Sequence, residues 1–198
     1  MGGPRLAPDQ KGAARLKAHL VFVDETGFLM DPTVRRTWGL RAQTPVLRHR
    51  LCHWGKVSAI GALTISRRRR HLGLYLHLYA GANICQEAVI AFLRDLRRHL
   101  GGPIVVVWDR WSVHRAGRVR RYLDGQTAIR VESLPPYAPD LNPMDKGWGW
   151  MKSHRLANHA PAHLEQLTEA VGEAHRAARD RQQLLRGFVR ATGLPIRL

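Results

Sequence analysis

Apolar residues gather in short runs that are too brief for membrane spans and too continuous for surface strands. Residues 19–24 and 104–108 are two such runs, rich in valine. Runs of this length and composition are typical of strands buried on both faces of a sheet. Each run leads to an acid, Asp24 at the end of the first and Asp109 just after the second.

Two further apolar segments, 57–65 and 73–79, predict a pair of strands joined by a turn. The turn is basic, because four consecutive arginines stand between Ser66 and His71. Arg67 and Arg68 are candidate contacts for the phosphates of a nucleic acid. The alternative is an ordinary solvated turn, which is the commoner fate of a charge run.

Apolar residues at spacings of three and four predict helices in the rest of the chain. The clearest covers 86–100 and ends at the sequence Gly101-Gly102-Pro103. The other predicted elements are a helix over 115–123, a strand over 128–134, and helices over 164–179 and 182–190. This alternation predicts an α/β fold in which right-handed crossovers place Asp24 and Asp109 at the same rim of the sheet.

A third acid stands at the start of a further predicted helix. Asn142 is a good N-cap, Pro143 suits the first helical position, and Asp145 then falls in the first turn. An acid there can simply stabilise the helix dipole or complete a capping box with Asn142. Asp145 is therefore a candidate site residue only in combination with the other two aspartates.

The chain is strongly basic, with 32 Lys and Arg against 15 Asp and Glu and a formal net charge of +17. This charge suits a polyanion, and nucleic acid is the expected partner. A genome rich in G and C would also load the surface with arginine, so the charge alone does not decide. The two cysteines, Cys52 and Cys85, predict neither a disulfide framework nor a thiolate zinc site.

The length of 198 residues is that of one ordinary domain. Residues 1–18 are rich in Gly, Pro, Lys and Arg and predict a flexible lead-in, so we expect the folded domain to cover 19–198. No apolar segment is long enough for a signal peptide or a membrane span. We therefore expect a protein of the cytoplasm with no membrane partner.

Three acids brought together in a basic protein need a counter-charge, because neighbouring carboxylates raise one another's pKa. A divalent cation with hard oxygen ligands supplies that charge, which favours Mg²⁺. Two such ions, about 3.5–4 Å apart, activate the attacking oxygen and stabilise the leaving oxygen of an in-line phosphoryl transfer. Asp24, Asp109 and Asp145 are therefore candidates for a two-metal site, and the alternatives are that Asp24 only turns the chain and that Asp109 only caps the turn after it.

Three motifs occur in order along the chain: Val-Phe-Val-Asp24-Glu-Thr-Gly-Phe, Val-Val-Trp-Asp109-Arg-Trp-Ser-Val-His114, and Leu134-Pro-Pro-Tyr-Ala-Pro-Asp-Leu-Asn-Pro-Met-Asp145. They resemble the mariner-like transposases, and more narrowly the bacterial insertion-sequence branch of that superfamily, the six-thirty group. The resemblance covers residues 20–159, and the 35 residues between Asp109 and Asp145 match the family's spacing. It implies a ribonuclease H-like fold, with a mixed central sheet flanked by helices, and an acidic triad that binds Mg²⁺ or Mn²⁺.

Carried over by position, Asp24 and Asp109 match the first two metal-binding acids, and Asp145 stands where this branch usually has Glu. Aspartate is the usual third acid of the mariner branch, so an all-aspartate triad is chemically competent, although a shorter side chain could misplace the second metal. His114 matches a recurrent histidine, for which the resemblance suggests a role near the scissile phosphate or in shaping the site; helix-start packing is the alternative. Glu25 is expected on the other face of the strand, behind the metal ligands at most.

The resemblance implies a transposase that cuts double-stranded DNA at transposon ends and joins the 3′ end to a target. Lys152 and Arg155, in the last motif's helix, are candidate DNA contacts. The family also implies a homodimer, action at the bacterial nucleoid, and a helix-turn-helix segment. Because about 18 residues precede the first strand here, we expect either that this segment is separately encoded or that the chain is the remnant of a broken element. Two alternatives stay open: a catalytically impaired remnant that binds DNA or assembles, and a general ribonuclease H-like nuclease, against which the third motif argues.

Overall fold

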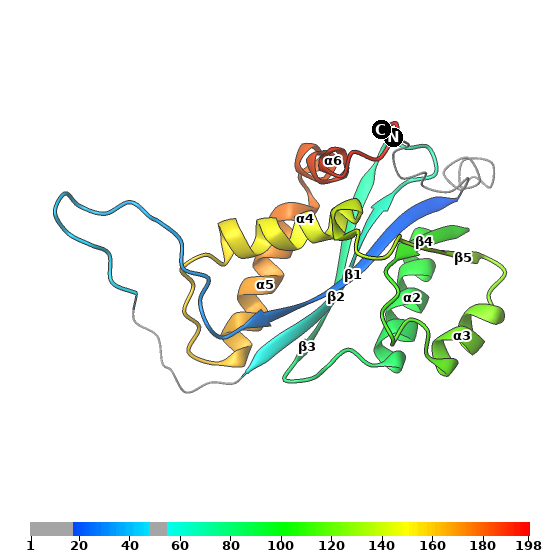
Figure 1. Ribbon diagram of the computed structural model, residues 1–198, viewed down its shortest axis with the longest axis horizontal. Helices are drawn as coiled ribbons and strands as arrows, with labels where there is room; N and C mark the ends of the chain where they lie inside the picture. The colour runs from blue at the N-terminus through cyan, green and yellow to red at the C-terminus, as the bar shows by residue number, and fades with distance from the viewer. Residues whose placement is uncertain (1–17, 48–54) are drawn as a thin grey trace.

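The computed structural model describes residues 18–47 and 55–198, which form a central sheet with helices on both sides (Figure 1). The five strands lie in the order β3-β2-β1-β4-β5. Their bounds are β1 His19–Leu29, β2 Lys56–Ile65, β3 Leu72–Ala80, β4 Ile104–Trp108 and β5 Ile129–Ser133. β1, β2 and β3 pair antiparallel, whereas β4 joins β1 and β5 in parallel. The predicted mixed sheet is confirmed.

Strand β1 is longer than the sequence predicts. The expected strand stopped at Asp24, but the ladder with β2 continues from Glu25 opposite Ile60 to Leu29 opposite Lys56. Pairing with a long hairpin strand extends β1 past the end of its apolar run. Asp24 therefore lies within β1, although it still lies beyond the part that pairs with β4, which ends at Phe22.

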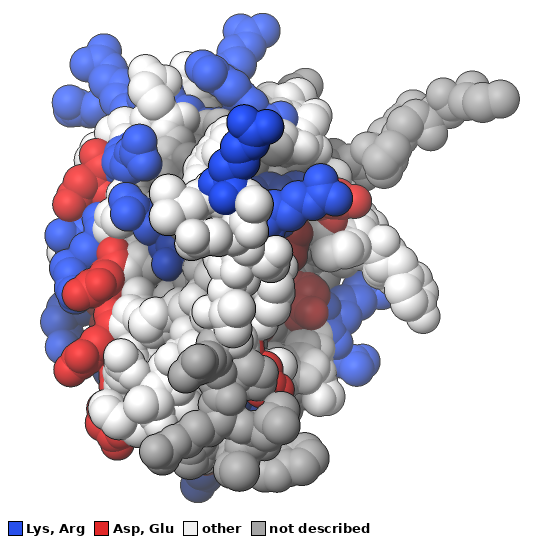
Figure 2. Space-filling view, turned by 90° about the vertical axis from the view of Figure 1, so that its left-hand side faces the viewer, with Lys and Arg blue, Asp and Glu red and all other residues white. Residues whose placement is uncertain are grey.

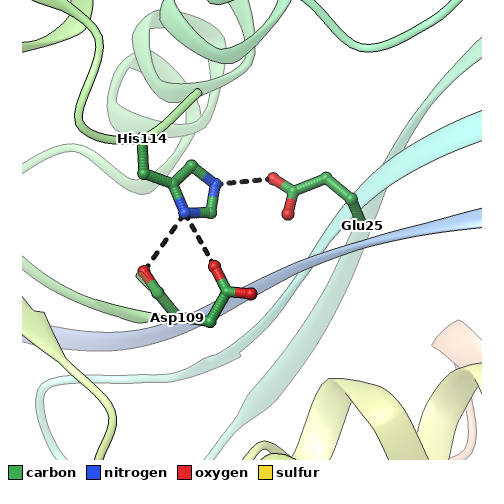
Figure 3. A group of neighbouring side chains, drawn as sticks. All are labelled: Glu25, Asp109 and His114. Carbon is green, nitrogen blue, oxygen red and sulfur yellow. Dashed lines mark hydrogen bonds and ion pairs between the residues drawn. The ribbon is translucent and has the colours of Figure 1, made fainter. Parts of the chain in front are cut away.

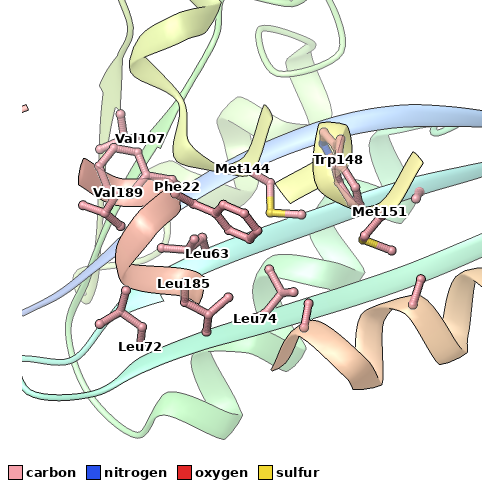
Figure 4. Close-up of a cluster of buried hydrophobic side chains, with 14 of the residues drawn as sticks. Phe22, Leu63, Leu72, Leu74, Val107, Met144, Trp148, Met151, Leu185 and Val189 are labelled. Carbon is pink, nitrogen blue, oxygen red and sulfur yellow. The ribbon is translucent and has the colours of Figure 1, made fainter. Parts of the chain in front are cut away.

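The helices form two layers because successive residues of a buried strand point to opposite faces of the sheet. One layer contains α2 (Gln86–Leu100) and α3 (Gly117–Asp124), and the other contains α4 (Pro143–Trp150), α5 (Leu164–Arg179) and α6 (Gln182–Ala191) (Figure 1). On the α4 side, Phe22 and Leu63 of the sheet meet Met144, Trp148 and Leu185 (Figure 4). A second core on the α2 side contains Val21, Val23, Phe92 and Trp108.

Local sequence signals placed most of the helices correctly. Helices α2 and α5 have the predicted bounds, and Gly101 ends α2 with φ of 59°, a left-handed conformation that glycine tolerates. Helix α4 starts at Pro143 as predicted, but it runs on through a single π-helical turn, η2 (Met151–Arg155). Among the described residues, no helix has the length and apolar character needed to span a membrane.

Candidate active site

The pairing of β1 with β4 brings the first two predicted acids to the same level of the sheet. Phe22 and Val107 are the last partners in this parallel ladder. Asp24 and Asp109 each follow two residues later, so both acids lie just beyond the carboxyl end of the paired segment. This is the rim of an open α/β sheet at which ligands commonly bind. The predicted approach of the two aspartates follows from this register.

The third acid is brought to this rim by the start of α4. Asn142 is buried and uses both ends of its side-chain amide: Oδ1 accepts a hydrogen bond from the backbone N–H of Met144 (3.1 Å), and Nδ2 donates to the carbonyl of Val23 (2.9 Å). The first contact caps the helix. The second contact ties the start of α4 to Val23, the residue before Asp24. Asp145, in the first turn of α4, therefore lies on the same side of β1 as Asp24.

The alternative role for Asp145, a reciprocal capping box, is not the one that the structure shows. The backbone N–H of Asn142 donates to the carbonyl of Pro139 (2.8 Å). A carboxylate oxygen of Asp145 instead lies 3.7 Å from Nζ of Lys146. The Asp145 carboxylate is half exposed and therefore accessible to a ligand.

The pKa of Asp24 is shifted by the acids around it. The indole N–H of Trp148 donates to its Oδ2 (3.0 Å). Burial and the neighbouring charge of Glu25 raise the pKa of the Asp24 carboxyl to about 7, with further contributions from Asp109 and Asp145, against the opposing effect of the Trp148 hydrogen bond. Asp24 therefore lies close enough to the other two aspartates for their charges to affect its ionisation.

The side chains at this rim are of the kind that binds a divalent cation. A largely shielded carboxylate beside three other acids is costly when ionised, and the Trp148 N–H compensates only part of that cost. Asp24, Asp109 and Asp145 offer hard oxygen ligands, the kind that Mg²⁺ and Mn²⁺ prefer. The chemistry of these side chains thus agrees with the metal predicted from the sequence.

A second group of ionisable side chains adjoins Asp109 on the opposite face of β1 (Figure 3). Nε2 of His114 lies 3.0 Å from Oε1 of Glu25, and Nδ1 lies 3.0 Å from Oδ1 of Asp109. Nδ1 also faces the backbone carbonyl of Asp109 (3.3 Å). The ligand atoms of the three residues lie within 4.8 Å of one another, close enough to be considered as a metal site.

His114 is buried and enclosed by aromatic rings. Its imidazole stacks on Trp108, with ring centroids 4.1 Å apart and planes at 4°, and Trp111 meets it edge-on at 5.6 Å. Burial alone lowers the pKa of His114, but the hydrogen bond and charge of Glu25 and the contacts with Asp109 outweigh it, so the pKa of the imidazole is raised.

Glu25 has a specific partner that its local sequence does not indicate. The expected direction of its side chain is correct, since it points away from the face on which Asp24 meets Trp148. Its partner, however, is a histidine 89 positions away. Alternation along β1 signals which face Glu25 occupies, but nothing local signals that His114 occupies that face as well.

Of the predicted DNA contacts, Lys152 lies closest to the acids. Its ammonium donates to Oγ1 of Thr26 (2.7 Å) and lies 5.4 Å from the ring centre of Phe28. Burial lowers the pKa of Lys152, whereas the charges of Asp145 and Asp24 act in the opposite direction. Arg155 is exposed, with its guanidinium 5.8 Å from the ring centre of Trp150.

Arg67 and Arg68 lie at the other end of the sheet. They follow Ile65, which pairs with Leu20 near the start of β1, whereas Asp24 pairs with Gly61. Both arginines are exposed. The structure therefore does not bring the basic hairpin tip together with the three aspartates.

Comparisons with known proteins point in one direction. A family model described as DDE superfamily endonuclease matches residues 19–168. Among solved structures, the chain is similar to the Mos1 mariner paired end complex with Mn, with a TM-score of 0.64 and 19% identity over 100% of this chain and 68% of that one. It is also similar to the Mos1 transposase paired-end complex with left transposon end, with a TM-score of 0.62 and 19% identity over 98% and 63% of the two chains.

The catalytic domain of Mos1 mariner transposase aligns along nearly its whole length, with a TM-score of 0.58 and 17% identity over 98% of this chain and 93% of that one. Comparison with curated protein sequences gave no match. At these identities the likeness establishes the fold, which is ribonuclease H-like, as the resemblance carried by the three motifs implied. The chain spans 68% and 63% of the two longer transposase chains.

Proposed function

The chain belongs to the DDE superfamily endonucleases, and on this basis we propose that it is the catalytic domain of a DNA transposase from the bacterial insertion-sequence branch, the six-thirty group. Its activity is metal-dependent cleavage of DNA at transposon ends, followed by joining of the 3′ end to a target. Asp24, Asp109 and Asp145 are the catalytic, metal-binding residues. The three motifs that surround these acids support the assignment to that branch.

The convergence of the three aspartates is the observation that carries this proposal. The β1–β4 register sets Asp24 level with Asp109. The hydrogen bond from Asn142 to Val23 draws in Asp145. Asp109 and Asp145, although far from Asp24 in the sequence, both contribute to its raised pKa because they lie near it in the fold.

The reaction is an in-line displacement at phosphorus. An oxygen of water, or of a DNA 3′-hydroxyl during strand transfer, forms a new P–O bond as the bond to the leaving oxygen breaks. Bound Mg²⁺ or Mn²⁺, which we propose to number two, supplies activation of the attacking oxygen and stabilisation of the leaving one. Asp24, Asp109 and Asp145 would hold the metal, and the Trp148 N–H holds one oxygen of Asp24 in place.

Double-stranded DNA is the proposed partner. Lys152 and Arg155 would contact its phosphates beside the aspartates, because the turn η2 that carries them continues directly from α4. Lys and Arg side chains also gather in the upper half of the face shown in Figure 2. Such clustering of positive charge suits the DNA backbone.

We also propose a homodimer and a separately encoded helix-turn-helix segment that recognises the transposon ends. The dimer is supported by the segment 31–47, which extends away from the body of the molecule (Figure 1) and exposes Trp38 and Leu40. Exposed apolar side chains of this kind mark interaction sites. The protein would act at the nucleoid of a bacterial cell.

The activity can be tested with supercoiled plasmid DNA that carries the sequences flanking the gene, incubated with the purified protein and Mn²⁺ or Mg²⁺. We expect metal-dependent nicking that falls to background in Asp109→Asn. Asp95→Asn, an exposed acid on α2, is the matched control and should nick like the wild type. If wild type and Asp109→Asn bind the plasmid alike and neither nicks it, the chain is a DNA-binding remnant and the catalytic proposal is wrong.

The third acid can be tested separately with Asp145→Glu, which restores the residue usual in this branch. A large gain in nicking would show that the longer side chain reaches the metal better and that the present copy is impaired. A loss would show that the pocket has adapted to aspartate. Unchanged nicking in both Asp145→Glu and Asp145→Asn would remove Asp145 from the site.

A further inference from the structure

Asp109 has one carboxylate oxygen that is held by the protein and one that is not. Its Oδ1 accepts a hydrogen bond from the backbone N–H of Trp111 (2.9 Å) and faces Nδ1 of His114 (3.0 Å). No hydrogen bond to Oδ2 comes from the part of the chain that the structure describes, and the side chain is 55% exposed. The carboxylate is thus anchored through one oxygen and accessible through the other.

The histidine that anchors Asp109 is itself held in place. Its side chain is only 1% exposed, it stacks on Trp108, and its second nitrogen faces Oε1 of Glu25 at 3.0 Å. A buried polar ring of this kind is costly unless both nitrogens have partners, and here both do. Glu25 is 12% exposed, and β1 fixes its position beside the ring.

We propose that Glu25 and His114 form a clamp that positions Asp109, keeping its free oxygen turned toward the metal that Asp24 and Asp145 would share; the inference rests on the proposed function. Two adjacent residues of β1 then contribute to the site from opposite faces of the sheet. Asp24 faces α4 and Glu25 faces His114, because neighbouring residues of a strand point to opposite faces. Asp109, at the end of β4, stands between them.

The same three residues could instead hold an ion of their own, since their ligand atoms cluster within 4.8 Å. Two facts argue for a clamp. The two imidazole nitrogens point in different directions and each already faces a carboxylate oxygen at 3.0 Å, so an ion bound at either nitrogen would have to displace one of these contacts (Figure 3). Mg²⁺ also prefers oxygen to imidazole nitrogen.

Mn²⁺ binding to the purified protein, measured by titration calorimetry without DNA, tests the clamp apart from catalysis. His114→Phe keeps a ring to stack on Trp108 but removes both nitrogens, and we expect Mn²⁺ affinity to fall by about 10–100-fold, as is typical when the partner of a metal ligand is lost. His114→Asn keeps an amide near the Nδ1 position and should recover part of the affinity. It also serves as the second variant if His114→Phe does not fold.

His175→Phe is the matched control, because His175 is another histidine, partly buried, that contacts a backbone carbonyl, that of Leu74. It should lower stability while leaving Mn²⁺ affinity unchanged. Glu25→Gln retains an oxygen that can accept from Nε2 and should lose less affinity than His114→Phe.

The outcomes separate the clamp from the proposed function. If Asp109→Asn abolishes Mn²⁺ binding while His114→Phe and His114→Asn bind like the wild type, the clamp is wrong and the proposed function stands. A nitrogen ligand to Mn²⁺ in pulsed electron paramagnetic resonance spectra, lost in His114→Phe, would make His114 a ligand and also overturn the clamp. Wild-type protein that binds no Mn²⁺ would contradict the proposed function itself.

Discussion

Gly61 lies opposite Asp24 in the β1–β2 ladder, and its missing side chain makes room for the ring of Trp148. A Cβ built on Gly61 would come within 2.6 Å of the Trp148 ring and 2.8 Å of Met144 Cε. Both neighbours are fully packed in the core. The close approach lets Trp148 lie over β2 and still donate its N–H to Asp24.

Gly61→Ala should therefore displace Trp148 and lower the free energy of unfolding by about 1–3 kcal/mol, the usual cost of adding a methyl group to a packed core. Chemical denaturation measures this change. Gly149→Ala is the control. Gly149 lies on α4, the helix that carries Trp148, and a Cβ there meets nothing within 4 Å. This variant should have unchanged stability or be stabilised by up to about 1 kcal/mol. Equal stability of Gly61→Ala and wild type would mean that Trp148 does not depend on this contact.

The edge strand β3 is covered by side chains from the helices beside it. The backbone N–H of Leu72 donates to Oε1 of Gln182 (2.9 Å), and its carbonyl accepts from Nε2 of the same residue (2.7 Å). Two positions along, the carbonyl of Leu74 accepts a hydrogen bond from Nε2 of His175 (3.0 Å). These contacts satisfy backbone groups that would otherwise be open to another strand. Helices α5 and α6 are tied to the sheet by the same bonds.

The lowered pKa of His175, which joins α5 to β3, predicts that the free energy of unfolding depends on pH. Burial lowers the pKa of His175 from its usual 6.5, and the charges of Arg179 and Arg176 lower it further, against the Leu74 carbonyl and Asp180. Below pH 6.5 the unfolded chain binds this proton before the folded chain does, so stability falls as the pH drops, by at most about 1.4 kcal/mol per pH unit for one proton. Above pH 6.5 both states are neutral and the contribution is constant.

We expect His175→Gln, whose amide can donate to Leu74 without titrating, to show a shallower loss of stability between pH 6.5 and 5 than wild type. Urea unfolding at several pH values measures the two slopes. His19, whose pKa is also lowered, is present in both proteins, so their difference isolates His175. Parallel curves would show that His175 does not control this dependence.

At the scale of the whole molecule, positive charge is spread over surfaces that lie far apart. Lys152 lies near Asp24 and Asp145, and Arg155 follows it in the same turn, whereas Arg67 and Arg68 are at the opposite end of the sheet. The net charge of +17 alone does not say which of these surfaces binds DNA. The salt dependence of DNA binding can identify the surface, because each phosphate contact contributes about 0.9 to the slope of log affinity against log salt concentration.

If the hairpin tip contacts DNA, the double variant Arg67→Gln/Arg68→Gln should reduce that slope by about two. Fluorescence anisotropy of a labelled duplex at several salt concentrations provides the measurement. Arg97→Gln/Arg98→Gln, on the exposed face of α2, removes the same charge elsewhere. Identical slopes for the two double variants would exclude a specific role for the tip.

The projecting segment 31–47 has a firm base and an apolar outer part. Asn158 holds the base with two hydrogen bonds to the backbone of Arg35, at 2.8 and 2.9 Å. Trp38 is 98% exposed and Leu40 is 74% exposed. In the view of Figure 2 this side of the molecule faces the reader, and uncharged residues occupy its centre. The side chains of Trp38 and Leu40 therefore do not pack on the rest of the described chain.

Trp38→Ser/Leu40→Ser should convert the proposed dimer to a monomer without loss of folding, because neither side chain is buried in the chain itself. Light scattering coupled to size exclusion gives the mass, and circular dichroism confirms the fold. Tyr137→Ser, which removes another exposed aromatic ring, should leave the mass unchanged. A double variant with the wild-type dimer mass would place the dimer contact elsewhere.

Local sequence was sufficient to predict most of the strands and helices and the class of chemistry. The apolar runs that end near Asp24 and Asp109 predicted the two parallel strands, and Asn142-Pro143 predicted the start of α4, because periodicity, caps and proline act within a few residues. The motifs around the acids indicated a transposase family, and the match over residues 19–168 confirms the broader assignment to the DDE superfamily endonucleases. The catalytic roles of the three aspartates stay predictions.

Only the tertiary structure decided which residues meet. Trp148 reaches Asp24, Asn142 reaches Val23, and His114 reaches Glu25 across 124, 119 and 89 positions of the chain. The extension of β1 beyond Asp24 likewise depends on its partner β2. Such contacts follow from strand order, register and packing on the two faces of the sheet, which no local pattern specifies because many arrangements satisfy the same alternation of apolar residues.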